Sequence, residues 1–513
     1  MLKPTAAFAA VALSSLSLTA GAVATPHHHR SRITRHHQAA HPLGPSSVPT
    51  PTVAGPVETP ASADRTRGIP YTTSAVDLRS HGYTETEYFV SGTARAYNPV
   101  GTLGTNGQWT VTPASTAPYK TRIIVRRPIN MRRFSGNVVV EWMNASTGRD
   151  LDVGWTFGYH GMLHDGDVYV GVTTQRLPIT SPTGLIAWDP QRYGSLSIPD
   201  DEYSYDIFSQ VGKALLSGQN AYVLGGAHPK DLIAYGDSQS ASRLTTYADA
   251  IQPRDGVYAA ILIHSRSGTG AALNDTVTVP DGTTIRSDSG AKVLTLETES
   301  DILRPGGGGY IDAQQPDSSS FRLWELTGAS HVSADEELLQ RIQAFKEYPL
   351  SNPPLDFNVC TQKTDDLDEG AVVDTALHDL GSWVGNDGRA TAPPEFPTVG
   401  VTGTGATASY TLNALGDTIG GMQMPQITVP IETLHGARTN SGSGNGNCAL
   451  EGVSVPFSTS QLQSLYATHA DYVARFSEAV HRAEHSGILQ PYDGEDEIEQ
   501  AQSSPVPDDS NVP

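Results

Sequence analysis

The segment from Leu232 to Leu244 carries the residue best suited to covalent chemistry, a serine where an apolar strand gives way to a helix. Its centre, Gly236-Asp237-Ser238-Gln239-Ser240, matches the pattern G-x-S-x-G except at its last position, where Ser240 replaces glycine. Small residues two before and two after the serine let the strand and the helix pass closely. A serine at such a bend can act as a nucleophile, so Ser238 is our candidate nucleophile.

A serine hydroxyl is a weak nucleophile and needs a base that is itself oriented by a carboxylate. Both partners follow Ser238 in the order serine, acid, histidine, each in a loop after an apolar strand. The acid loop contains Glu299 and Asp301, and the next one ends at His331. We predict His331 as the base and favour Asp301 as the acid, with Glu299 as the alternative.

Four other histidines compete less well for the role of base. His264 also ends a strand, but it precedes the acid loop, so we expect it to line the pocket or cap a strand. His378, His435 and His469 lie in the C-terminal region without a preceding strand and loop.

A tetrahedral intermediate on Ser238 requires two backbone NH groups that bind its oxyanion. One is expected from Gln239, directly after the nucleophile. The second is expected from the loop after an earlier strand, at Asn144 or Ala145.

Around these loops the sequence alternates between short apolar runs and segments with helical spacing. Such alternation predicts an α/β fold with a mostly parallel sheet covered by helices on both faces, and an active site at the carboxyl ends of the strands. Alternating residues between 77 and 127 predict an antiparallel edge before it. The predicted strands are 137–142, 167–173, 232–235, 258–264, 292–297 and 321–326, and the predicted helices include 151–163, 203–216, 371–383 and 458–484.

Composition excludes several classes of protein. The chain has 513 residues with a formal net charge of -21, which argues against binding to nucleic acid or to an anionic membrane surface. Hydrophobic residues make up 38% and charged residues 17%, as in a globular protein. The serine, acid and histidine described above favour a small-molecule or polymeric ester as partner, and the oligomeric state stays open.

The ends of the chain differ in composition from its centre. Lys3, an apolar stretch and Ala22-Val23-Ala24 predict a signal peptide over residues 1–24, with cleavage near Ala24 and secretion. Residues 25–64 are rich in His and Pro and predict a disordered linker. Residues 65–489 then form the catalytic domain with a C-terminal elaboration from about residue 349, and the acidic residues 490–513 predict a disordered tail.

Cys360 and Cys448 are the two cysteines of the chain. In an exported protein such a pair predicts a disulfide. Neither cysteine has the spacing of a metal site, so we expect no metal and no cofactor.

The chain resembles the large alpha/beta-hydrolase domain-containing proteins of bacteria and fungi, a family within the α/β-hydrolase superfamily. The resemblance spans roughly residues 65–480 and implies an α/β-hydrolase fold with ester hydrolysis through Ser238, His331 and a loop carboxylate. Besides the serine, acid and histidine segments, it rests on residues 138–144, 189–194, 202–210, 263–268, 448–457 and 465–473.

The leading hypothesis is a secreted serine hydrolase that cleaves carboxylic esters through an acyl-enzyme. A peptidase, an amidase or a polyester depolymerase could use the same triad. A binding protein that kept the fold without its chemistry is the non-enzyme alternative, although it would be expected to lack one triad member.

Overall fold

A computed structural model describes residues 48–63, 67–304, 308–347, 359–385, 390–443 and 447–506. The described residues all fall within one compact unit, Leu43–Pro513. The predicted signal peptide lies outside the described residues, as does the predicted linker up to residue 47.

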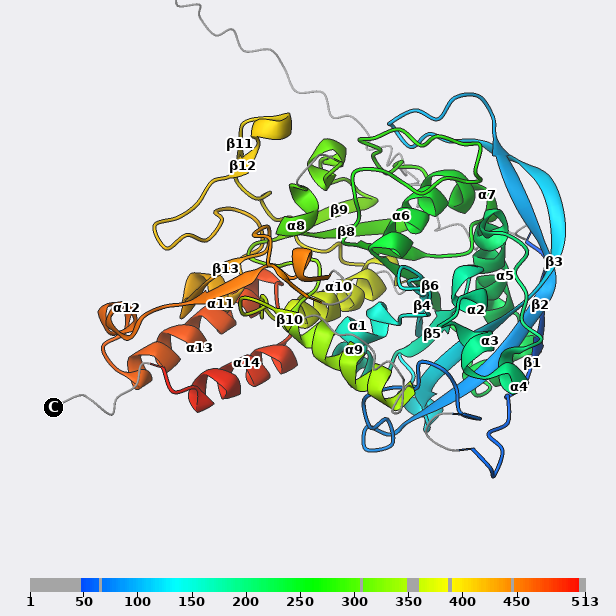
Figure 1. The fold of residues 1–513 in the computed structure, drawn as a ribbon, viewed down its shortest axis with the longest axis horizontal. Helices are drawn as coiled ribbons and strands as arrows, with labels where there is room; N and C mark the ends of the chain where they lie inside the picture. Colours follow the sequence, from blue (N-terminus) through cyan, green and yellow to red (C-terminus); the bar gives the residue numbers. More distant parts are fainter. Residues whose placement is uncertain are drawn as a thin grey trace, which may run out of the picture. The chain divides into compact units, whose positions relative to one another are not determined.

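The secondary structure alternates between strands and helices over its central part (Figure 1). The strands are β1 Thr52–Ala54, β2 Tyr83–Pro99, β3 Val111–Pro128, β4 Asn137–Trp142, β5 Val168–Val172, β6 Asp231–Asp237, β7 Ala260–His264, β8 Lys292–Thr298, β9 Phe321–Leu326, β10 Val359–Cys360, β11 Val401–Thr402, β12 Ser409–Tyr410, β13 Glu432–His435, β14 Gly442–Ser443 and β15 Val453–Pro456. The α-helices are α1 Val153–Asp165, α2 Leu177–Thr180, α3 Leu185–Trp188, α4 Pro190–Tyr193, α5 Ser204–Leu216, α6 Gln239–Thr246, α7 Gln252–Asp255, α8 Glu299–Ile302, α9 Ala334–Glu347, α10 Glu369–Val384, α11 Pro425–Thr428, α12 Thr459–Leu465, α13 His469–Ser486 and α14 Pro491–Ser503. Shorter 3₁₀ and π segments are η1 Met131–Arg133, η2 Asp201–Tyr203, η3 Gly218–Leu224, η4 Tyr247–Ile251, η5 Tyr310–Ala313, η6 Gly405–Thr407 and η7 Asn447–Ala449.

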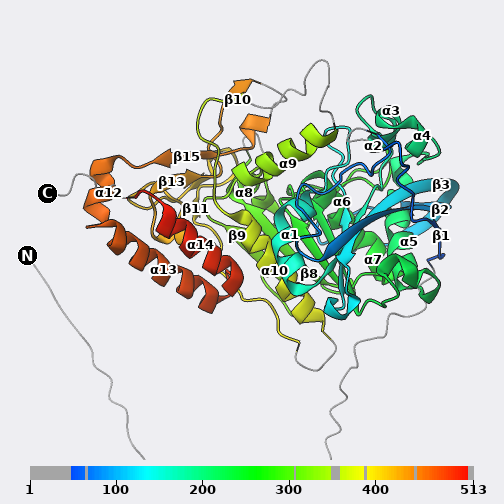
Figure 2. The same cartoon turned by 90° about the horizontal axis from the view of Figure 1, so that it is seen from below.

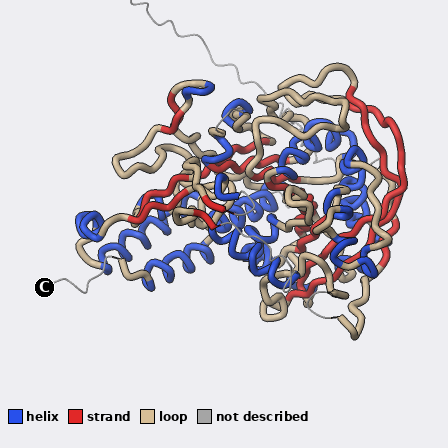
Figure 3. The backbone as a smooth tube through the Cα atoms, in the orientation of Figure 1, coloured by secondary structure: helices blue, strands red, loops and turns tan. Residues whose placement is uncertain are grey.

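The main sheet has the strand order β1-β2-β3-β5-β4-β6-β7-β8-β9. Its first three pairings, up to β3 with β5, are antiparallel. The remaining pairings, from β5 with β4 to β8 with β9, are parallel. Figure 3 shows β2 and β3 as a long curved pair at one edge. The structure thus confirms the predicted mostly parallel sheet with an antiparallel edge before it.

Both faces of this sheet are buried. Val138 and Val140 of β4 belong to a hydrophobic cluster with residues of α5 and α6. Val139 belongs to a second cluster with residues of α1 and α10. Because successive side chains of a strand point to opposite faces, a strand covered on both sides is apolar throughout. This explains the continuous apolar runs in the sequence.

The C-terminal region, residues 359–506, packs against the second face of the sheet. Its helix α10 lies beside α1, and α13 lies beside α14, as Figure 2 shows from below. Cys360 and Cys448 form the predicted disulfide, with a Cα–Cα distance of 5.6 Å. The bond closes a loop across 88 residues, which in the chain-entropy account is worth about 4 to 5 kcal/mol.

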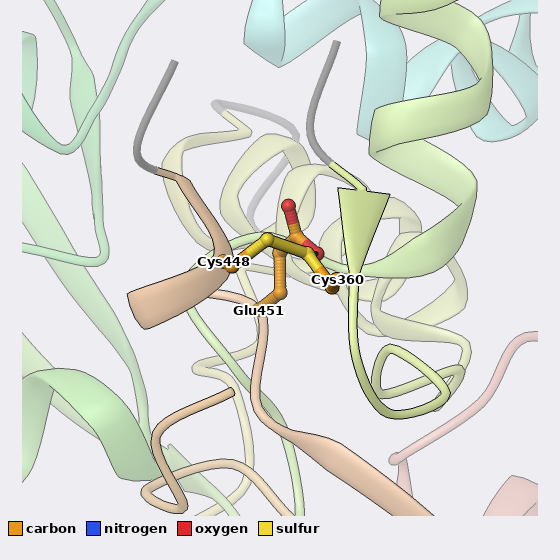
Figure 4. Close-up of side chains that lie close together, drawn as sticks. All are labelled: Cys360, Cys448 and Glu451. Carbon is orange, nitrogen blue, oxygen red and sulfur yellow. Dashed lines mark hydrogen bonds between the residues drawn. A yellow bond between two sulfur atoms is a disulfide. The ribbon is translucent and has the colours of Figure 1, made fainter. Parts of the chain in front are cut away.

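Glu451 lies beside this disulfide (Figure 4). The two sulfur atoms are bonded to each other, so no thiolate remains there to bind a metal ion.

The structure differs from the sequence prediction at both ends of the domain. Residues 52–54, inside the predicted disordered linker, form β1 and pair with β2. Residues 491–503, inside the predicted disordered tail, form α14, whose buried positions include Gly494 and Ala501. The single helix predicted over 458–484 is two helices, because Thr468 caps a new helix at His469. No helix among the described residues is both long and apolar enough to cross a membrane.

The antiparallel edge is joined to the parallel sheet by a fully buried arginine of β3. The side chain of Arg122 has no exposed surface and forms ion pairs with Glu87 at 3.0 Å and with Asp150 at 2.8 Å. A buried charge of this kind is tolerated only while its partners stay in place.

We therefore predict that Arg122→Met lowers the free energy of unfolding by about 3 to 5 kcal/mol, because Asp150 loses its counter-charge and Glu87 keeps only Arg192. Urea denaturation measures this loss. Arg132→Met is the matched control, because Arg132 is exposed, and it should change stability by less than about 0.5 kcal/mol. Equal stability of the two variants would contradict the structural role of Arg122.

Candidate active site

Ser238 lies at a sharp turn between β6, which ends at Asp237, and α6, which begins at Gln239. Its backbone has φ 55° and ψ -114°, a conformation that residues other than glycine rarely adopt. The backbone NH of Ser238 donates to the carbonyl of His264 at the end of β7, at 2.9 Å. A strained backbone conformation persists only where the surrounding structure holds it, so the neighbours of Ser238 must stabilise this turn.

Two small residues make this turn possible. A Cβ atom at Gly236 would lie 2.9 Å from the carbonyl oxygen of Ser240 and 3.0 Å from the Leu244 side chain, so a larger residue would push the strand and helix apart. Ser240, which replaces glycine in the pattern, is fully buried. Its hydroxyl accepts from the NH of Asp237 at 3.0 Å and donates to the carbonyl of Asp237 at 2.8 Å. The sequence suggested only that Ser240 is small enough for this position, whereas in the structure its hydroxyl also stabilises the turn by two hydrogen bonds.

Ser238, His331 and Asp301 form a continuous chain of hydrogen bonds. The Oγ atom of Ser238 lies 2.8 Å from Nε2 of His331. Nδ1 of His331 lies 2.8 Å from Oδ1 and 3.0 Å from Oδ2 of Asp301. In this arrangement Nδ1 donates to the carboxylate, which leaves Nε2 free to accept a proton from the serine hydroxyl.

The Asp301 carboxylate is held in its ionised form although it is fully buried. It accepts from the Thr298 hydroxyl at 2.7 Å and from Arg304 at 2.8 Å. Burial alone would raise the pKa of Asp301, but the nearby His331 charge, the hydrogen bond with His331 and Arg304 lower it below its usual value. Burial likewise opposes the charged form of His331, yet Asp301, with Asp237, raises the pKa of His331 to about 9.

Glu299, the alternative acid, points elsewhere. Its side chain accepts from the NH of Gly328 at 2.8 Å. Burial raises the pKa of Glu299 to about 7, although hydrogen bonds from Gly328, Thr418 and Ala437 oppose the rise. Glu299 therefore joins the loop after β8 to the C-terminal region, while Asp301 alone of the two carboxylates bonds to His331.

The predicted oxyanion donors are not all available. The NH of Asn144 donates to the carbonyl of Leu151 at 3.0 Å, so the prediction that Asn144 offers this group is wrong. Its side chain shapes the loop, because it accepts from the NH of Ser146 at 2.8 Å. The NH of Ala145 faces the side-chain oxygen of Gln239 at a long 3.4 Å, and the NH of Gln239 lies in the first turn of α6.

His264 belongs to a buried network beside the turn between β6 and α6. Its Nδ1 lies 2.7 Å from the Tyr235 hydroxyl and 3.6 Å from Asp237, and its Nε2 lies 2.7 Å from Glu369. The sequence analysis missed Glu369, because this residue comes from α10, more than a hundred residues after His264. The only local signal was an acidic residue two positions before the predicted helix 371–383, which in the structure begins at Glu369.

The three remaining histidines bond or lie elsewhere. His378 pairs with Asp165 at 2.7 Å, and His469 lies 2.7 Å from the carbonyl of Val506. His435 ends β13. His435 therefore does end a strand, contrary to the expectation, but that strand pairs with β15 and lies outside the main sheet.

A family model described as an alpha/beta hydrolase domain matches residues 53–499 of the chain. None of the curated proteins matches the chain.

Solved structures resemble the chain over about half of its length. An α/β serine hydrolase without lid from Xanthomonas campestris is 11% identical, with a TM-score of 0.27, and the match covers 50% of this chain and 93% of that one. A serine hydrolase homologue from Coxiella burnetii is 13% identical, with a TM-score of 0.27, over 45% and 93%. A fungal esterase from Rhizomucor miehei is 12% identical, with a TM-score of 0.24, over 46% and 74%. Likenesses at this level carry no argument about activity.

The contact between His331 and Asp301 predicts an unusual titration. In ¹⁵N-histidine NMR spectra His331 should titrate near pH 9, and Asp301→Asn should bring its pKa down towards or below the ordinary value of about 6.5, because burial then opposes the charge with less compensation. Glu299→Gln is the matched control and should leave this titration in place. A pKa of His331 that responds to Glu299→Gln and not to Asp301→Asn would contradict the assignment of the acid.

Proposed function

Because the chain belongs to this family of alpha/beta hydrolase domains, we propose that it is a secreted serine hydrolase that cleaves carboxylic esters, with Ser238 as nucleophile, His331 as base and Asp301 as acid. The observation that carries the proposal is the 2.8 Å contact between Ser238 Oγ and His331 Nε2. It lies at the strained bend between β6 and α6.

In the first half of the reaction, Ser238 Oγ attacks the ester carbonyl while His331 Nε2 takes the hydroxyl proton. The Asp301 carboxylate stabilises the imidazolium that forms. His331 then gives the proton to the alkoxide leaving group, so the alcohol departs and the acyl group stays on Ser238. In the second half, His331 takes a proton from water, which attacks the acyl-enzyme, and returns that proton to Ser238 as the acid leaves.

The oxyanion formed in each half needs NH donors at the bend. We assign this role to the backbone NH groups of Gln239 and Ala145. The 3.4 Å separation between the Ala145 NH and the Gln239 side chain is long for a hydrogen bond, so a substrate oxygen could replace the amide oxygen there. This scheme uses no cofactor.

Asp301 suits the role of acid better than Glu299 on charge as well as on distance. A group that stabilises an imidazolium must itself be negative at neutral pH. The pKa of Asp301 is lowered, whereas that of Glu299 is raised to about 7. Glu299 is then protonated in part where Asp301 remains charged.

Secretion is supported by two features of the chain. The N-terminal 24 residues have the pattern of a signal peptide. The disulfide between Cys360 and Cys448 is a bond that forms and persists in oxidising compartments.

The proposal predicts covalent labelling of one serine. A fluorophosphonate probe should label the native protein with loss of fluoride, and Ser238→Ala should abolish labelling, because the oxygen that becomes phosphonylated is lost. Ser242→Ala, one turn further along α6, is the matched control and should be labelled normally. A native protein that resists the probe would favour the non-catalytic binding protein instead.

Turnover of a short acyl ester should separate the two carboxylates. Asp301→Asn should lower kcat by roughly 10³- to 10⁴-fold, as expected when the histidine loses its orienting carboxylate. Glu299→Gln should retain most of the activity.

Ester preference is tested on the native enzyme by comparing the ester and the amide of the same acyl group. Faster cleavage of the amide would overturn the proposed preference for esters.

The pH profile follows from the raised pKa of His331. Only neutral imidazole accepts a proton, so kcat/KM of the native enzyme should rise with pH and level off above about 9. A profile that levels off near pH 6.5 would show that Asp301 does not hold the histidine charge in the free enzyme.

A further inference from the structure

We propose that His160, Asp374 and Asp493 form a binding site for one divalent transition-metal ion of the Zn²⁺ type, which holds α14 against α1 and α10. The three residues come from these three helices, in the order α1, α10 and α14. The site lies outside the proposed catalytic machinery, and its test does not depend on activity.

The geometry of the cluster suits a small cation. One ligand atom from each residue lies within 4.8 Å of the other two. His160 Nδ1 is 3.0 Å from Asp493 Oδ1 and 4.0 Å from Asp374 Oδ2. Zinc bonds of about 2.1 Å in a tetrahedral site separate neighbouring ligand atoms by about 3.4 Å. The two observed separations lie on either side of that value, so small side-chain movements would complete the site.

Both carboxylates have buried oxygens that lack a donor. Asp374 is 2% exposed and Asp493 is 4% exposed. Oδ1 of Asp374 and Oδ2 of Asp493 have no hydrogen-bond partner among the described residues, and neither has the nearby hydroxyl of Tyr492. Buried polar atoms are normally paired, and an unpaired buried carboxylate is especially costly. Each carboxylate thus has one oxygen facing His160 and one buried oxygen that a bound ion could also contact.

The charges of the cluster also point to a divalent ion. Two ionised carboxylates beside a neutral imidazole carry a charge of about -2, which one M²⁺ ion cancels. Further negative charge is close, because Asp496 lies 3.7 Å from Nε2 of His160. The competing account keeps the cluster neutral with protons instead, one on His160 and one shared by the carboxylates.

The way α14 docks distinguishes this cluster from an ordinary ion pair. The buried residues of α14 are Asp493, Gly494, Glu497 and Ala501, so two of the four are carboxylates and none is a large hydrophobic residue. Glu497 already accepts from the Gln426 amide at 2.6 Å. Asp493 has the His160 imidazole as its side-chain partner, and it is the residue through which a metal ion would fix the helix.

The ligand set selects the class of ion. Imidazole favours Zn²⁺ and neighbouring transition metals, whereas Ca²⁺ and Mg²⁺ prefer sites built entirely from oxygen. One histidine with two aspartates is a three-ligand set that leaves a position for water or for the Tyr492 hydroxyl.

The test uses the full chain after dialysis against EDTA, with ZnCl₂ as the probe. Bound zinc per chain is measured after gel filtration, and the midpoint of thermal unfolding is measured with and without zinc. We expect one tight site in the native protein and a rise of several degrees in the midpoint, because the ion binds the folded state alone. Asp374→Asn should weaken this site by about tenfold or more and remove the rise in midpoint.

Histidines near the N-terminus require a control, because His27, His28 and His29 can also bind zinc. Replacing these three by alanine should leave the rise in midpoint unchanged. Should Asp374→Asn not fold, His160→Gln provides the second variant, since its side chain is 41% exposed and its loss leaves the core intact.

Three outcomes would overturn the proposal. They are a native midpoint that zinc does not raise, a rise that persists in the variants of Asp374 or His160, and a rise that disappears with the three N-terminal histidines. The first of these, together with a more stable Asp374→Asn protein in EDTA, would establish the shared proton instead.

Discussion

The backbone at Ser238 is the constraint on which the rest of the site depends. Its positive φ turns the chain out of β6 and into α6 within one residue, and this turn places Oγ beyond the carboxyl edge of the sheet. The absence of a side chain at Gly236 allows the close approach of strand and helix. Hydrogen bonds to the Ser240 hydroxyl and to the carbonyl of His264 then hold the turn. Because parallel neighbours end at the same edge, the loops after β8 and β9 bring Asp301 and His331 to the hydroxyl.

Much of this arrangement could be predicted from the sequence, since Ser238, Asp301 and His331 each follow an apolar strand directly and in a fixed order. A parallel sheet converts that order into proximity. The sequence favoured Asp301 but left Glu299 as the alternative, because both lie in one short helical turn and the direction of a side chain depends on packing. Asn144 was misjudged for a related reason, since only the fold reveals that its NH pairs with Leu151.

The helix α14 explains why composition misled at the C-terminus. Acidic and polar residues predominate there, and such segments seldom bury enough apolar surface to fold alone. Small residues, Gly494 and Ala501, nevertheless let the helix lie close to its neighbours, and Pro491 begins it at a favourable position. The helix packs against its neighbour α13 and also against residues of α1 and α10 more than a hundred positions earlier, and no local pattern reveals these contacts.

The C-terminal region also supports the histidine loop. The NH of Val332 donates to the carbonyl of Leu450 at 3.2 Å, and the NH of Ala334 donates to the carbonyl of Asp365 at 2.9 Å. These contacts come from the two segments that the disulfide joins.

Buried carboxylates lie close to His331, and the negative charge of Asp237 adds to that of Asp301 in raising the pKa of His331. Burial raises the pKa of Asp237 itself to about 6. Above that pH both carboxylates are charged and favour the protonated form of His331. At neutral pH this leaves less neutral His331 to act as a base. The same charges stabilise the imidazolium that forms when His331 takes the proton of Ser238 in the proposed reaction.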